Sequence, residues 1–137
     1  MKRLGAYCKL EMVELAEEKI DEKAAGEAVI REALDKEAKR ILAAVPKGAV
    51  IAALCVEGRG MTSEGLAAWM QQQALAGQGD IAFVVGSSHG LGKAVKEQAA
   101  LKLSLSAMTL PHQLARLVLA EQIYRAYTIQ AGGKYHK

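Results

Sequence analysis

The chain has 137 residues, of which 51% are hydrophobic and 24% are charged, and its net charge is +3. This length suits one domain, residues 1–137, around one core, and the apolar content excludes an intrinsically disordered protein. The mildly basic balance permits an RNA partner without requiring one. No apolar run approaches the roughly 18 residues of a membrane-spanning helix, the first residues lack the apolar core of a signal peptide, and Cys8 and Cys55 offer no metal-binding spacing. These exclusions predict a cytoplasmic protein with no membrane segment and no metal.

The first part of the chain predicts two strands and one helix. Residues 8–15 alternate between apolar and charged side chains, which indicates a strand near a sheet edge. Between about 28 and 45 the apolar residues recur every three or four positions, which predicts a helix with one buried stripe that Pro46 ends. Residues 49–56 carry no charge and predict a strand buried on both faces, and residues 57–60 predict a loop.

After this loop, strands and helices alternate to the end of the chain. Thr62 or Ser63 can cap the next helix. The expected elements are a helix to about 76, a strand over 81–85, a helix after 90 to about 100, a strand over 103–106 and a helix over 111–127. This alternation predicts an α/β domain with a mostly parallel sheet.

Three loops follow the expected strands, after Leu54, after Val85 and after Leu105. The carboxyl ends of parallel strands meet at one edge of a sheet, and ligands bind there. The loop that starts at Gly86 is rich in glycine but matches neither the GxGxxG nor the GxxxxGK[ST] phosphate motif. It is therefore either a tight turn or a place where backbone contacts a ligand without a phosphate.

The third loop offers hydroxyl groups from Ser104, Ser106 and Thr109, together with backbone donors and acceptors. This surface suits a flat heteroaromatic base, although a helix that Pro111 opens and Thr109 caps explains the same residues. Met108, like Trp69 and Met70, is on local grounds a core or interface residue rather than a ligand contact.

Several cationic and aromatic residues follow the third loop. His112 and Arg116 lie one helical turn apart, so that a phosphate contact is plausible for Arg116, whereas Arg125 pairs with Glu121. A lone histidine such as His112 is more often a structural or exposed residue than a catalytic one. The tail either binds an RNA backbone and stacks on a base or is a solvated end, and it comprises Lys134, Tyr135, His136 and Lys137.

Residues 103–116, 121–126 and 135–137 together closely resemble the ribosomal RNA large subunit methyltransferase H family of the SPOUT superfamily. The resemblance covers nearly the whole chain. It implies a trefoil knot in the C-terminal part, a homodimer, and S-adenosylmethionine held in the knot loops. The reaction that it implies is methylation at N3 of a pseudouridine in 23S rRNA, with the assembled ribosome as substrate.

The resemblance also implies roles for individual residues. Those expected to bind the cofactor are Leu54, Gly86, Ser87, Ser106, Ala107, Met108, Thr109, Leu110 and Pro111. Those expected to place RNA or to take part in catalysis are His112, Arg116, Tyr135, His136 and Lys137, with Lys134 as a further RNA contact. His136 or His112 is the candidate general base for the N3 proton.

The sequence departs from the family pattern at three places. Ser87 stands where a glycine is frequent, and Cys55 stands where an acid often follows the leucine of the first loop. The family's first strand is expected to be missing from this chain. Two rival functions remain: a non-catalytic RNA-binding or ribosome-associated dimer, and an unrelated nucleotide-binding α/β enzyme.

Overall fold

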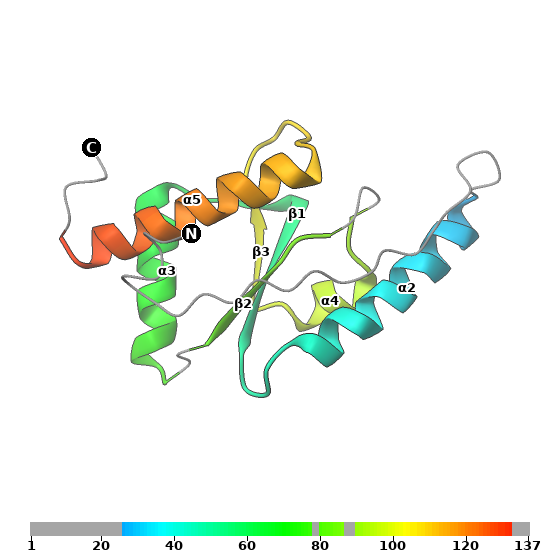
Figure 1. Cartoon of the computed structure of the whole chain (residues 1–137), viewed down its shortest axis with the longest axis horizontal. Helices are drawn as coiled ribbons and strands as arrows, with labels where there is room; N and C mark the ends of the chain where they lie inside the picture. Colours follow the sequence, from blue (N-terminus) through cyan, green and yellow to red (C-terminus); the bar gives the residue numbers. More distant parts are fainter. Residues whose placement is uncertain (1–25, 78–79, 87–89, 133–137) are drawn as a thin grey trace.

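The computed structural model describes residues 26–77, 80–86 and 90–132, which form an α/β fold (Figure 1). The strand predicted over 8–15, and the strand expected to be missing before it, concern residues outside these ranges. The described elements, in chain order, are α2 (Glu27–Ala44), β1 (Val50–Gly60), α3 (Ser63–Leu75), β2 (Ile81–Val84), α4 (Lys93–Gln98), β3 (Leu101–Ser104) and α5 (His112–Gln130).

The three described strands form a parallel sheet in the order β2-β1-β3, which confirms the predicted parallel arrangement. Val50 of β1 lies opposite Ile81 of β2, and Ala52 lies opposite Leu101 of β3. The central strand must be apolar on both faces, since helices cover both sides of the sheet. This position explains why residues 49–56 carry no charge.

β1 continues to Gly60, so the loop predicted over 57–60 is wrong. Leu103 of β3 lies opposite Leu54 and, after a shift of register, opposite Arg59. Residues 55–58 stand between these two pairings and form what we call the β1 bulge. A Cβ atom at Gly58 would come within 2.8 Å of the carbonyl carbon of Lys102, so the bulge is pressed against the neighbouring strand. The glycines and charges of this segment suggest a loop. It is a strand because it pairs with β3, which lies more than 40 residues later in the chain.

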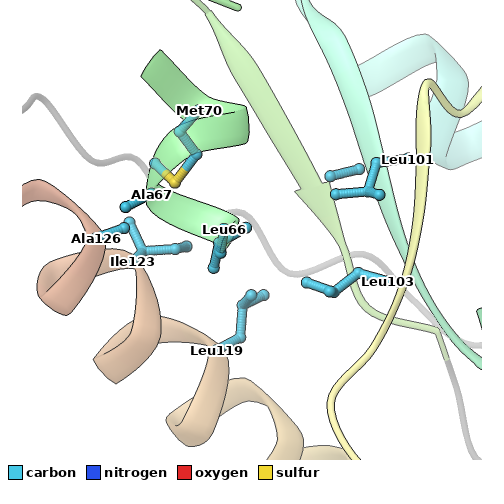
Figure 2. Close-up of a cluster of buried hydrophobic side chains, with 9 residues drawn as sticks. Leu66, Ala67, Met70, Leu101, Leu103, Leu119, Ile123 and Ala126 are labelled. Atoms are coloured by element: carbon cyan, nitrogen blue, oxygen red, sulfur yellow. The ribbon is translucent and has the colours of Figure 1, made fainter. Parts of the chain in front are cut away.

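Helices α3 and α5 pack on one face of the sheet, and α2 and α4 pack on the other (Figure 1). Figure 2 shows the core under the first pair, where side chains of α3 and α5 meet those of β3. Its fully or nearly buried members are Ala52, Leu66, Ala67, Met70, Leu101, Leu103, Leu119, Ile123 and Ala126.

Two hydrogen bonds fix α3 against α5. The Ser63 hydroxyl donates to the Gln122 amide oxygen at 2.6 Å, and the Gln130 amide donates to the carbonyl oxygen of Ala67 at 3.1 Å. Thr62 caps α3, since its hydroxyl accepts from the Gly65 N–H at 2.9 Å. The predicted cap is therefore confirmed at Thr62, and the predicted burial of Met70 is confirmed as well.

The second core, between α2, α4 and the sheet, contains mostly smaller side chains, among them Ala38, Ala53, Cys55 and Val95. The two helices approach closely at Gly92, where a Cβ atom would lie 2.5 Å from the carbonyl oxygen of Leu34. This packing therefore requires small residues, which allow α4 to lie against the central strand.

Candidate functional site

A cavity of about 720 Å³ opens at the carboxyl edge of the sheet. Its wall is built from the end of β1 with the β1 bulge, from the residues that follow β2, and from the end of β3 with the loop that leads into α5. Pockets of this volume hold small organic ligands. The prediction that the three loops open on one edge of the sheet is confirmed for the described residues.

The cavity brings together most of the residues that were predicted to bind a cofactor. Ser87 lies outside the described residues, and Ala107 is exposed and stands between two lining residues without lining the cavity itself. Seven of the nine predicted residues line the cavity, namely Leu54, Gly86, Ser106, Met108, Thr109, Leu110 and Pro111. Met108 is 76% exposed, so it is not a core residue, and its alternative assignment to an interface stays a prediction.

The loop between β3 and α5 is held by its own serines. The Ser104 hydroxyl donates to the carbonyl oxygen of Ser106 at 3.0 Å, and the Ser106 hydroxyl accepts from the Met108 N–H at 3.0 Å. These bonds turn the chain back on itself, so backbone groups of the loop border the cavity. Thr109 does not cap α5 as predicted, because Pro111 occupies the cap position and makes no side-chain hydrogen bond there.

The segment after β2 turns tightly at its glycines. A Cβ atom at Gly86 would overlap the carbonyl oxygen of Gly90 and would come within 2.9 Å of Leu91 Cγ. Gly90 itself has a φ of +96°, a conformation that side chains other than glycine rarely adopt. The interpretation as a tight turn is therefore confirmed at Gly86 and Gly90. Contact of this backbone with a ligand stays a prediction, and both glycines line the cavity.

Two charged residues that the sequence analysis missed also line the cavity. The Lys96 ammonium of α4 donates to the Glu57 carboxylate of the β1 bulge at 2.5 Å. This hydrogen bond and a second one from Glu57's own backbone hold the pKa of the carboxyl below its ordinary value. One signal was available for Glu57, which follows the uncharged strand directly, but no local pattern singles out Lys96 on a short helix.

Cys55 lies beside this pair, 8% exposed, and lines the same cavity. Burial raises the pKa of its thiol, and the negative charge of Glu57 raises it further, against a smaller opposing effect of Lys96 and Lys102. The thiol is therefore neutral at ordinary pH, and Cys55 behaves as a small buried apolar residue.

The residues predicted to bind RNA or to act in catalysis are only partly described. Arg116 is half-buried on α5, one residue beyond the lining residue Ala115, and takes part in a polar or charged interaction. His112 is the first residue of α5, and its side chain lies outside the described part of the structure. The tail residues also lie outside it, namely Lys134, Tyr135, His136 and Lys137. Arg125 pairs with Glu121 as predicted, with Nε 2.9 Å from Oε1.

In the described ranges, no three His, Cys, Asp or Glu residues gather in a way that could hold a metal ion. No helix within the same ranges is both long enough and apolar enough to cross a membrane.

A family of sequences described as predicted SPOUT methyltransferase matches residues 1–136 of the chain. The chain belongs to this family. The SPOUT methyltransferase assignment confirms the resemblance read from residues 103–116, 121–126 and 135–137.

Individual relatives show to which group within the family the chain belongs. A protein from Streptococcus sanguinis is 47% identical over 137 residues, which is 100% of this chain and 86% of the relative. One from Bifidobacterium adolescentis is 47% identical over 136 residues, or 99% of this chain and 85% of the relative. One from Clostridioides difficile is 44% identical over 138 residues, with 99% and 85% covered. Each carries the name ribosomal RNA large subunit methyltransferase H, and the chain belongs to this group of SPOUT methyltransferases.

Proposed function

We propose that the chain is an S-adenosylmethionine-dependent methyltransferase that acts on large-subunit ribosomal RNA. The observation that carries the proposal is the cavity where the ends of three parallel strands meet, lined by seven of the residues expected to hold the donor. The names of the relatives support ribosomal RNA as the substrate.

The cavity fits S-adenosylmethionine in size and in chemistry. Leu54, Leu105 and Leu110 give it apolar walls suited to adenine, and the serine-held loop presents backbone groups to the edge of the base. The tight turn at Gly86 lets backbone come close to the ligand, and no phosphate-binding motif is needed for a donor without a phosphate. When bound, S-adenosylmethionine supplies a methyl group that its sulfonium has already activated.

The chain's own residues have three tasks in this reaction. The cavity walls orient the donor so that its methyl group faces the incoming base, which converts a bimolecular encounter into a positioned one. Arg116, Lys134 and Lys137 contact the RNA backbone, and Tyr135 stacks on a base. His136 or His112 accepts the proton of the attacked nitrogen, which we propose to be N3 of a pseudouridine in 23S rRNA within the assembled ribosome.

We further propose a homodimer and a C-terminal trefoil knot. The dimer is supported by Leu114 and Leu117 of α5, which are 44% and 65% exposed, and by the exposed Met108 at the start of the same region. A second copy that covers these side chains would remove apolar surface from water next to the cavity. The knot rests on the resemblance, with the chain threaded after β3 through the loops that line the cavity. A cytoplasmic location follows from the ribosomal substrate.

The test separates donor binding from methyl transfer. Calorimetric titration of the full chain with S-adenosylmethionine should give saturable binding, and transfer of a labelled methyl group should favour assembled ribosomes over free 23S rRNA. Removal of residues 135–137 should abolish transfer and largely spare donor binding. A chain that binds ribosomes but no donor would instead be the non-catalytic RNA-binding protein, and binding of nucleoside triphosphates in its place would indicate an unrelated nucleotide enzyme.

A further inference from the structure

Glu57 and Lys96 form an ion pair in the wall of the cavity, joined at 2.5 Å between the β1 bulge and α4. The Lys96 side chain is 31% exposed and that of Glu57 is 59% exposed. Both groups therefore remain open to the cavity, and a ligand can reach the pair without a rearrangement of the core.

Within the described part of the chain, these are the two charged side chains that line the cavity. The remaining lining residues are apolar, hydroxyl-bearing or small, and they suit adenosine. A wall of this kind would bind the nucleoside part of a donor by van der Waals contact and hydrogen bonding. The Glu57–Lys96 pair is the part of the wall that suits a ligand group with charges of both signs.

The methionine part of S-adenosylmethionine carries an α-ammonium and an α-carboxylate on the same carbon atom. We propose that Glu57 binds this ammonium group and that Lys96 binds this carboxylate, so the pair recognises the zwitterionic tail of the donor. This inference rests on the proposed function, since it assigns the tail of the same ligand.

The state of the free protein supports this assignment. Glu57 is ionised at neutral pH, as any glutamate of ordinary or lowered pKa is, and the Lys96 hydrogen bond holds its carboxylate in place before the ligand arrives. A pair this exposed adds little to folding stability, because solvent screens it. Variants of the pair should therefore fold, and changes in their ligand affinity will reflect recognition.

The test uses three ligands that share a 5′-methylthioadenosine unit. S-adenosylmethionine has both tail charges, its decarboxylated form keeps the ammonium group, and 5′-methylthioadenosine lacks the tail and, with it, the sulfonium charge. Calorimetry gives the dissociation constants of the unchanged chain, Glu57→Gln and Lys96→Met. Lys93→Met is the matched control, since Lys93 lies on the same helix, pairs with Glu97 at 3.6 Å and does not line this cavity.

Loss of a charged hydrogen bond should weaken binding about tenfold or more. Glu57→Gln should weaken S-adenosylmethionine and the decarboxylated donor by this factor and leave 5′-methylthioadenosine unchanged. Lys96→Met should weaken only the ligand that has the carboxylate, and Lys93→Met should change none.

Equal weakening of all three ligands would overturn the inference, because the pair would then act on adenosine or on the shape of the cavity. Unchanged affinity of both variants for S-adenosylmethionine would overturn it as well. An unchanged chain that binds none of the three ligands would overturn the proposed function, and this inference with it.

Discussion

The face of the sheet under α3 and α5 is packed with long side chains, whereas the face under α2 and α4 is packed mostly with smaller ones. Leu66, Leu119 and Ile123 interlock on the first face, and side-chain hydrogen bonds tie its helices together. On the second face, Gly92 lets α4 lie against α2. The first face is therefore built for stability, and the second is built for the close placement of a short helix that carries Lys96 to the cavity.

The largest expected effect comes from the first face. Ile123→Ala removes three buried carbon atoms and should lower the free energy of unfolding by about 2–5 kcal/mol. Val95→Ala on the second face removes two and should lower it by less, in proportion to the smaller buried volume. Denaturant unfolding of both variants measures the difference, and an equal or larger loss at Val95 would contradict the contrast between the faces.

A smaller loss of stability should follow when the second face is overfilled. Gly92→Ala places a Cβ atom against Leu34 and Ala38 and should cost about 1–3 kcal/mol. Gly60→Ala is the control, since a Cβ atom there meets nothing within 4 Å. Thermal unfolding compares the two variants, and equal melting temperatures would mean that α2 and α4 have room to separate.

A change of about 1 kcal/mol should appear in two different properties at two serines. Ser106→Ala removes the acceptor for the Met108 N–H and should weaken S-adenosylmethionine binding roughly fivefold, with little change in stability. Ser63→Ala removes the bond to Gln122 and should lower stability by a similar energy without affecting the donor. Titration and unfolding of both variants test this, and a shared loss of both properties would mean that core and cavity are coupled.

The smallest effect concerns the reactivity of Cys55. Because its pKa is raised, the neutral thiol should react slowly with iodoacetamide at neutral pH and faster as the pH rises through this pKa. The contribution of the buried neutral thiol to the free energy of unfolding is fully present at neutral pH and is lost as the pH rises through this pKa. Alkylation rates in the Cys8→Ser background measure the effect, and donor binding should slow them because Cys55 lines the cavity. A rate equal to that of a free thiol would contradict the burial.

Those parts of the fold that depend on local patterns could be predicted from the sequence. The helix over Glu27–Ala44 follows from its apolar stripe. The central strand follows from its uncharged run, because a strand in a sheet that helices cover on both faces is apolar on both of its own faces. The three loops of the cavity follow from the alternation of strands and helices. The residues of the third loop could be assigned to the donor only through the family resemblance, because hydroxyls before a helix also suit a cap.

The features that the sequence did not reveal depend on partners far away along the chain. β1 continues beyond Val56 because β3 pairs with it again at Arg59. No local pattern in the sequence indicates this pairing. Glu57 and Lys96 are 39 residues apart, and each alone resembles an ordinary surface charge. Thr109 failed as a cap because Pro111, two residues later, sets where the helix begins.

The β1 bulge leaves the sheet opposite Leu103 and returns to it opposite the same residue. A segment that departs from and rejoins one partner can be altered without shifting the register of the strands on either side. The conditions are that a glycine is kept where the segment touches Lys102 and that a small apolar residue is kept at Cys55 in the core. The fold thus offers a replaceable segment beside the cavity, and a protein engineer could vary the lining of the cavity there while leaving the sheet as it is.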